Sequence, residues 1–250
     1  MIPTLPDLVV AAFVCFCRVG GCFMVMPGFS SVRLPMQIRL FVAVSATLAL
    51  LMNLSDQIVP HVRGDQTSLL LLILSETLIG GLIGLMARFY VLSLSFAGHA
   101  IAMSMGFSGG MAPSIEEADG GPTLAVLISF AALLLLFVLD FHHEIVKAIV
   151  LSYELAPLNV FFRPQQALVD LTDTLAEAFM VVLRLASPFI AYGLLVNLAI
   201  GFVNKLTPQI PVYFISLPFV LAGGLILMYF AIAPLLSLFA DGFVSVSIGR

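Results

Sequence analysis

The chain has 250 residues, of which 61% are hydrophobic and only 10% are charged, and its formal net charge at pH 7 is −4. A soluble domain carries about 25% charged residues, so this composition excludes an ordinary soluble domain and predicts helices that cross a membrane or pack inside a membrane complex. The few charges form no basic block, which argues against nucleic acid as a partner.

The first apolar run covers residues 8–26 and is long enough for a membrane-spanning helix, which needs about 20 apolar residues. The N-terminus lacks a basic region and a small-residue cleavage site, so no signal peptide is predicted. Three cysteines in this run match no zinc or haem motif and are expected to be packing residues: Cys15, Cys17 and Cys22.

A short loop separates this run from a second predicted span, residues 40–54. Arg33 lies in that loop and Arg39 lies beside it, and no other short connection has two basic residues so close together. Basic residues favour the cytoplasmic side of a membrane, so this loop is expected to be cytoplasmic.

Residues 69–87 and 89–105 are two further apolar runs with only Arg88 between them. They form either two helices or one long, bent helix. Glu76 lies in the first run, and Gly80 and Gly84 follow it on one helical face. Because glycine at this spacing lets a second backbone approach closely, the face predicts a packing groove with a carboxylate at its end.

The next segment, MGFSGGMAPSIEEADGGP, is referred to as the glycine-rich loop, residues 105–122. Its glycines permit backbone conformations that other residues resist, and its Met and Phe side chains offer deformable apolar bulk. Such a segment is either a plain solvent-exposed turn or a loop that packs into a narrow opening.

Residues 123–139 form an uncharged apolar run, after which polar residues recur at helical spacing and predict an amphipathic helical hairpin over residues 140–175. Leu168, Leu171 and Leu175 are expected on its apolar face. The segment LDFHHEIVK offers candidate metal ligands, but its adjacent histidines diverge by about 100° on a helix. A polar helix boundary is therefore favoured over a metal site at Asp140, His142, His143 and Glu144.

The last part of the chain contains two more apolar stretches, residues 176–203 and 210–240. The second is interrupted by prolines and glycines and suits either one tilted span or two half-length helices. Pro208 and Pro211 interrupt helical hydrogen bonding and predict a sharp turn between the two stretches. The pattern predicts an all-α, polytopic membrane-type protein of six or seven hydrophobic helices, as a single domain over residues 1–250.

Four charged residues lie inside apolar runs, where each costs roughly 2.5–3.5 kcal/mol at a bilayer centre; they are Arg18, Glu76, Glu177 and Arg184. Their side chains either orient helix packing or take part in transport. Glu177 and Arg184 are two helical turns apart, about 10.5 Å of rise, so partners on other helices or other chains are favoured over a direct pair. No set of residues resembles a catalytic centre, and neither an enzymatic activity nor a cofactor is expected.

Several segments occur in one characteristic order: Arg18 with Pro27, then Pro35 and Arg39; ETLIGGLIG at residues 76–84; MGFSGGM at 105–111; LDFHH at 139–143; and NLAIGFVNKLTPQIPVYF at 197–214. In these segments the chain resembles the FliR family of flagellar biosynthetic proteins, a component of the type III secretion export gate. One departure is the separation of Asp119 from Pro122, because many relatives carry an Asp-Pro step after the glycine-rich loop.

The resemblance implies a pore-forming subunit of the flagellar export gate in the bacterial inner membrane and basal body, needed to export unfolded rod, hook and filament proteins. It implies a helical hetero-oligomer with FliP-like and FliQ-like subunits, with FlhA-like, FlhB-like and rod proteins as further partners, in which the helices are raised toward the periplasm. It also implies that the glycine-rich loop is a pore plug formed by Met105, Gly106, Phe107, Ser108, Gly109, Gly110 and Met111. Glu116, Glu117 and Asp119 would lie at the wetter margin of the plug.

Two further groups of residues are expected to act in assembly. Subunit packing and intramembrane charge are assigned to Arg18, Glu76, Gly80, Gly84, Glu177 and Arg184, and a corner at a subunit seam to Asn204, Lys205, Pro208, Gln209 and Pro211. The alternatives are the paralogous subunit of a virulence injectisome and an independent polytopic transporter.

Overall fold

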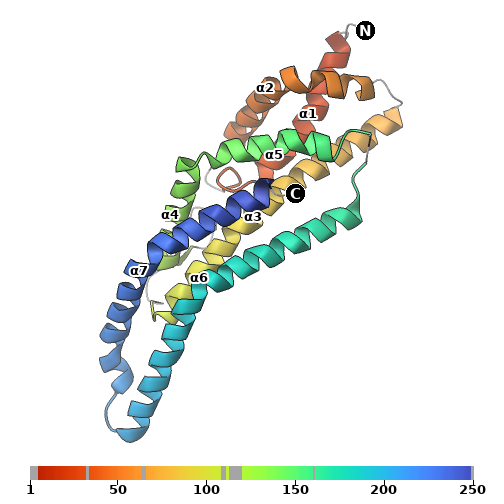
Figure 1. Cartoon of the computed structure of the whole chain (residues 1–250). Helices are drawn as coiled ribbons and strands as arrows, with labels where there is room; N and C mark the ends of the chain where they lie inside the picture. The colour runs from red at the N-terminus through yellow and green to blue at the C-terminus, as the bar shows by residue number, and fades with distance from the viewer. Residues whose placement is uncertain are drawn as a thin grey trace. The chain divides into compact units, whose positions relative to one another are not determined.

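A computed structural model of the chain describes residues 5–31, 34–62, 66–107, 111–112, 120–159 and 161–248. Within them it contains seven helices: α1 (Leu5–Val25), α2 (Met36–Val62), α3 (Gln66–Ser104), α4 (Thr123–Val138), α5 (Phe141–Leu155), α6 (Pro164–Leu206) and α7 (Val212–Ile248) (Figure 1). The only strands among the described residues are β1 (Met111–Ala112) and β2 (Gly121–Pro122), a two-residue antiparallel pair. The predicted all-α fold class is confirmed.

Helix lengths differ from the predicted runs at three places. The runs on either side of Arg88 form one helix of 39 residues, α3. The final stretch also forms one helix, α7, of 37 residues, with Pro218 and Pro234 inside it. The second predicted span, residues 40–54, lies within the apolar stretch Met36–Ser55 of α2, and the helix continues beyond it to Val62; Leu54 and Ile58 keep one face of that extension buried.

Contacts within the chain divide it into two compact units. Unit 1 consists of Met1–Phe89, Asp140–Leu175 and Val244–Arg250, and unit 2 of Tyr90–Leu139 and Ala176–Phe243. Three helices, α3, α6 and α7, continue from one unit into the other. The single domain over residues 1–250 therefore stays a prediction.

Unit 1 has a core built on one face of α1. The buried positions Ala11, Cys15, Arg18 and Cys22 recur at intervals of three and four residues, which places them on the same side of a helix. Helix α1 packs against α2, and α5 contributes a buried row at intervals of four: Ile145, Ile149 and Tyr153. The three cysteines are free, two of them are buried and Cys17 is half-buried, as expected for packing residues.

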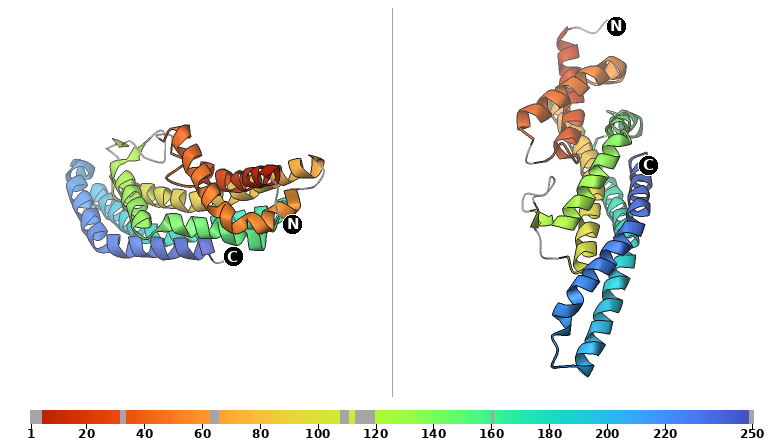
Figure 2. Two further views of the ribbon diagram at one scale, coloured as in Figure 1. Left: turned by 90° about the horizontal axis from the view of Figure 1, so that it is seen from above. Right: turned by 90° about the vertical axis from the view of Figure 1, so that its left-hand side faces the viewer.

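Unit 2 has a core made by the second half of α3, by α4, and by parts of α6 and α7. Helix α4 buries one face at helical spacing: Ala125, Ile128, Ala132 and Leu136. The Tyr90 hydroxyl of α3 donates to the carbonyl of Phe239 in α7 at 3.0 Å, and the two rings stack. After the turn at residues 207–211, α7 returns beside the end of α6 in each view (Figure 2).

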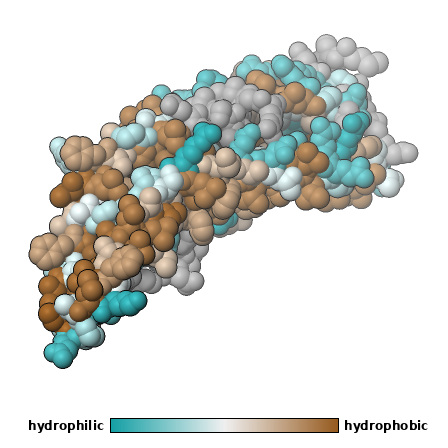
Figure 3. All heavy atoms as spheres, turned by 60° about the horizontal axis from the view of Figure 1, so that its bottom comes forward, coloured by the Kyte–Doolittle hydropathy of each residue, from teal (hydrophilic) through white to brown (hydrophobic). Residues whose placement is uncertain are grey.

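Much of the apolar surface of α6 and α7 is uncovered. The most apolar stretch is only 28% buried in α6 and 17% buried in α7. Figure 3 shows apolar side chains gathered over the end of the α6–α7 hairpin, with hydrophilic groups at its tip. Among the residues that the structure describes, five helices qualify as membrane spans by length and composition, or six if the broken pair of α4 and α5 counts as one, so the chain is a multi-pass membrane-type protein.

The predicted amphipathic hairpin over residues 140–175 corresponds to α5 and the first turns of α6 in unit 1. In this part of α6 the buried positions are the small residues Ala167 and Thr174. The larger Leu168 and Leu175 are 63% and 53% exposed. Two of the three leucines expected on the apolar face are therefore uncovered in the isolated chain, and Leu171 is half-buried.

Candidate functional site

A buried ion pair lies at the centre of unit 1. The Arg18 Nε donates to Glu76 Oε2 and the Arg18 Nη2 to Glu76 Oε1, both at 2.7 Å. The two side chains are 0% and 1% exposed. This two-point geometry matches the planar guanidinium to the carboxylate and is among the strongest side-chain interactions in proteins.

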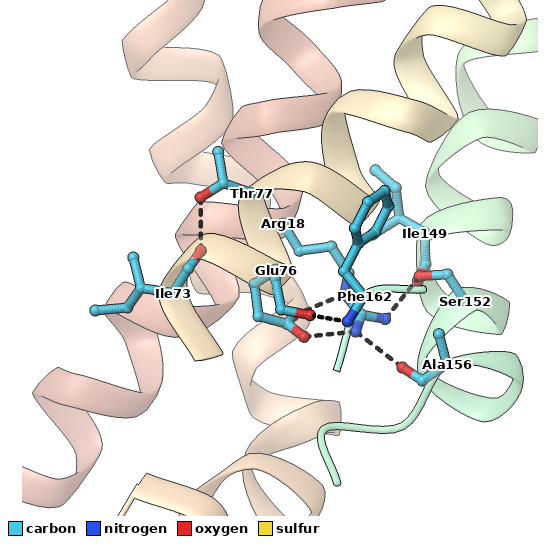
Figure 4. Close-up of polar contacts among 9 residues, drawn as sticks. Arg18, Ile73, Glu76, Thr77, Ile149, Ser152, Ala156 and Phe162 are labelled. Carbon is cyan, nitrogen blue, oxygen red and sulfur yellow. Dashed lines mark hydrogen bonds and ion pairs between the residues drawn. The ribbon is translucent and has the colours of Figure 1, made fainter. Parts of the chain in front are cut away.

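The rest of the Arg18 guanidinium contacts α5 and the residue that follows it (Figure 4). Its Nη1 donates to the Ser152 hydroxyl at 3.0 Å, and its Nη2 donates to the Ala156 carbonyl at 2.9 Å. Its Cζ also lies 3.8 Å from the centre of the Tyr153 ring. One arginine of α1 therefore connects α3 with the C-terminal end of α5.

The glycines of α3 bring its backbone against α1 at this point. A Cβ at Gly80 would lie 1.9 Å from the Arg18 carbonyl oxygen, and a Cβ at Gly84 would lie 2.5 Å from the Cys22 carbonyl oxygen. From the other side, a Cβ at Gly21 would lie 2.8 Å from the Thr77 carbonyl oxygen. The structure thus places Arg18, Glu76, Gly80 and Gly84 in one helix crossing.

The other two predicted intramembrane charges lie apart from this crossing. Glu177 and Arg184 belong to the part of α6 in unit 2 and are exposed. Apolar side chains surround them in sequence and are also exposed, among them Phe179, Met180 and Leu183. The assignment of Glu177 and Arg184 to subunit packing stays a prediction.

The glycine-rich loop begins in a defined helix cap. The Phe107 amide donates to the Ala102 carbonyl at 2.8 Å and the Gly106 amide donates to the Met103 carbonyl at 3.1 Å. Gly106 has a φ of 73°. This is the Schellman arrangement that ends helices, with glycine at the left-handed position. Residues 105–107 are thus a fixed root of the loop.

Met105 is part of that root and is fully buried. A Cβ at Gly224 of α7 would lie 2.9 Å from the Met105 Cγ and Cε atoms. The Met105 side chain is therefore occupied in the core of unit 2, while Phe107, the next large apolar residue of the predicted plug, is half-buried.

The loop returns to the core of unit 2 through β2. Ala112 pairs with Gly121, and Met111 pairs with Pro122. The His99 ring covers the buried Gly121, where a Cβ would lie 2.7 Å from its Nε2. Both ends of the loop are thus held in unit 2. The predicted plug residues Ser108, Gly109 and Gly110, and the acids Glu116, Glu117 and Asp119, lie outside the described residues, and the plug stays a prediction.

The predicted corner is a turn between α6 and α7. Helix α6 ends at Leu206 and α7 begins at Val212. The Ile210 amide donates to the Thr207 carbonyl at 3.2 Å, which closes the turn. The predicted corner residues are all exposed: Asn204, Lys205, Pro208, Gln209 and Pro211. Their location at a subunit seam stays a prediction.

The segment expected to be a polar boundary does separate α4 from α5. Asp140 adopts a left-handed conformation with φ of 56°, which aspartate tolerates better than most residues. Its carboxylate lies 3.6 Å from His143, and Glu144 pairs with Lys147 at 2.7 Å. In the described part of the chain, no group of three His, Cys, Asp or Glu residues is placed to hold a metal ion.

Sequence reasoning missed the partners of Arg18 on α5 and the role of Arg39. Tyr153 belongs to the row of buried residues that recurs every four positions in α5, and Ser152 lies next to it, so that period was the available signal. Arg39 donates from Nη2 to the carbonyls of Ser31 and Leu34, so it holds the connection between α1 and α2. No local sequence pattern predicts this role of Arg39.

Comparison with known proteins gives one consistent relationship. The model of the family described as bacterial export proteins, family 1, matches residues 9–246. The chain is 30% identical over 236 residues to the flagellar biosynthetic protein FliR of Caulobacter vibrioides, which covers 93% of this chain and 92% of that protein. It is 28% identical to FliR of Escherichia coli, over 90% of this chain and 84% of that protein. It is 25% identical to FliR of Bacillus subtilis, over 89% of this chain and 86% of that protein.

Proposed function

The chain belongs to the bacterial export proteins, family 1, with flagellar FliR proteins as its relatives, and on this basis we propose that it is a pore-forming subunit of the flagellar type III export gate. Membership in the family gives it a role in flagellar protein export. Its long apolar helices make it a multi-pass protein of the bacterial inner membrane. In the proposal it lines a conduit for unfolded rod, hook and filament subunits as part of the basal body, with its helices raised toward the periplasm.

The observation that carries the proposal is the uncovered apolar surface of α6 and α7. Large side chains such as Leu194, Phe214 and Phe230 are more than two-thirds exposed. Arg184 is exposed on the same helix as Leu194, and an arginine facing the centre of a bilayer costs roughly 2.5–3.5 kcal/mol. Cover by other protein chains accommodates both the apolar residues and the charge. FliP-like and FliQ-like subunits are the proposed cover, with FlhA-like, FlhB-like and rod proteins as further partners.

The glycine-rich loop is the proposed plug of the conduit. Its two ends are held in the core of unit 2 by the Gly106 cap and by the pairing of β1 with β2. A segment fixed at both ends can close an opening without leaving the subunit. The half-buried apolar side chain of Phe107 at the root of the loop would help to exclude water and ions, since a hydrophobic constriction closes a pore by dewetting.

Removal of residues 108–110 tests the plug directly. This deletion leaves the Gly106 cap and the strand pair in the sequence and shortens only the segment between them. We expect membranes that hold the assembled gate to conduct small ions more strongly with the deletion than without it, at an equal amount of complex. The matched control is Gly81→Ala in α3, because a Cβ at this position meets nothing within 4 Å and the proposed partner cover lies on α6 and α7. Unchanged conductance in the deletion variant contradicts the plug.

A further inference from the structure

The root of the glycine-rich loop sits in a socket formed by α6 and α7 of unit 2. The main chain of Ser104 lies against Gly193 of α6, where a Cβ would be 2.6 Å from the Ser104 carbonyl oxygen. The side chain of Met105 lies against Gly224 of α7, where a Cβ would be 2.9 Å from Met105 Cγ. Ser104, the last residue of α3, and Met105, which follows it, therefore contact the two helices so closely that an added methyl group at either glycine would force a neighbouring atom to move.

The two walls of this socket are joined to each other beside the root. The Tyr192 hydroxyl of α6 donates to the Val220 carbonyl of α7 at 2.7 Å. The same hydroxyl fills the space over Gly223, where a Cβ would lie 2.5 Å from it. Gly106, at the left-handed position of the cap, also faces Val220 of α7. A Cβ added at Gly106 would lie 3.9 Å from the Val220 Cγ1 atom. Tyr192 and the loop root thus contact the same turns of α7.

We infer that Gly224 is a positioning residue for the loop. Because glycine has no side chain, Met105 can lie directly against α7 at this point. A shift of α7 would therefore move the point at which the loop leaves the core. The reason is geometric. Close-packed interiors transmit small displacements because their contacts cannot be compressed. A shift of α7 at Gly224 displaces Met105, and the Gly106 cap carries that displacement into the first residue of the loop. This inference rests on the proposed function of the loop as a plug.

A merely structural role for Gly224 predicts a different result from a positioning role. If the contact only stabilises the core, an added methyl group lowers the amount of assembled complex but leaves the conductance of each complex unchanged. If the contact positions the loop, the methyl group displaces Met105 and changes the conductance of complexes that assemble normally. Conductance per complex therefore separates the two roles.

The experiment compares Gly224→Ala with Gly81→Ala in the assembled gate, and includes the 108–110 deletion in parallel. We expect Gly224→Ala to raise ion conductance per complex toward that of the deletion, and Gly81→Ala to match the unsubstituted protein. Adding Met105→Ala to Gly224→Ala removes the Cγ and Cε atoms that the methyl group meets. That double variant also lacks the Met105 side chain that holds the loop root against α7, so its conductance is expected to stay raised, and conductance at the unsubstituted value contradicts the positioning role.

Each outcome decides a separate point. A deletion that leaks, together with a Gly224→Ala variant that conducts like Gly81→Ala, overturns the inference and leaves the plug in place. A deletion that does not leak overturns the plug and the inference with it.

Should Gly224→Ala prevent assembly, Tyr192→Phe removes the bond to Val220 without adding bulk. It is expected to give a smaller rise in conductance, and an unchanged conductance then overturns the inference.

Discussion

Arg18 shows how one residue can hold three helical segments. Its guanidinium makes two bonds to Glu76 of α3, one to Ser152 of α5 and one to the carbonyl of Ala156. Arginine suits this place because its planar group presents five donors in a fixed fork. Lysine offers a single point charge and would lose the two-point contact with Glu76.

Removal of one partner of this buried pair is expected to destabilise the protein strongly. Arg18→Met leaves the Glu76 carboxylate without its cation, and breaking a buried ion pair in this way costs about 3–5 kcal/mol. Arg18→Met with Glu76→Leu removes both charges and is expected to recover a large part of that loss. The measurement is the thermal unfolding midpoint of the purified complex; equal midpoints for the single and double variants would argue against the pair.

The crossing of α1 and α3 gives a second prediction for single residues. Gly80→Ala places a methyl group 1.9 Å from the Arg18 carbonyl oxygen, and backbone atoms cannot move aside cheaply. Gly81→Ala is the matched control, because its methyl group meets nothing within 4 Å and alanine favours a helix over glycine by about 1 kcal/mol. We expect a much lower yield of folded protein for the Gly80 variant and an undiminished yield for the control. Similar yields would contradict the close approach of the two backbones.

Among the elements, the end of α3 matters most for the proposed plug because it fixes where the loop begins. Gly106→Ala forces a side chain into the left-handed conformation at φ of 73°, which costs roughly 1–2 kcal/mol. Gly106→Asn is expected to be milder, since asparagine accepts this conformation more readily. Thermal unfolding of the complex checks the order glycine, asparagine, alanine. Equal midpoints would mean that the cap does not hold the loop root.

The turn between α6 and α7 is expected to act in assembly and not in folding of the chain. Pro208 and Pro211 are exposed, so replacing both with alanine removes no buried contact in the subunit. We expect the subunit to reach the membrane in normal amounts and to co-purify more weakly with FliP-like and FliQ-like partners. Co-purification at the usual yield would count against a subunit seam at this turn.

The elements were largely predictable from apolar runs and from helix-breaking residues. The run 123–139 corresponds closely to α4, and the paired prolines mark the turn before α7. The continuity of α3 through Arg88 stayed open, because a single arginine interrupts the apolar pattern without interrupting backbone hydrogen bonds. The strand pair at Met111–Ala112 was missed, since two residues are too few to show an alternating pattern.

The pairing of Arg18 with Glu76 shows why the site was harder to predict than the elements. Helical spacing identified Glu76, Gly80 and Gly84 as one face, but periodicity says nothing about which helix meets that face. Arg18 and Glu76 are 58 positions apart, and the contact depends on how α1 and α3 cross. The burial of Met105 was missed for the same reason, because it depends on Gly224 of a distant helix.

For the whole molecule, the uncovered apolar surface of α6 and α7 is the observation from which we propose that the chain is a subunit and not an independent protein. The apolar stretch of α1 is 50% buried, whereas that of α7 is 17% buried. An exposed arginine and exposed apolar residues on one helix are accommodated together when other protein chains cover that helix. Assembly with sibling subunits around a conduit is therefore the central proposal, and the proposed role of the glycine-rich loop as a plug depends on it.

The mass and composition of the particle purified in mild detergent test that claim most directly. Native mass spectrometry should find this chain within a large hetero-oligomer that contains FliP-like and FliQ-like subunits. A monomer or small homo-oligomer, with its helices solvated by detergent alone, would contradict the account.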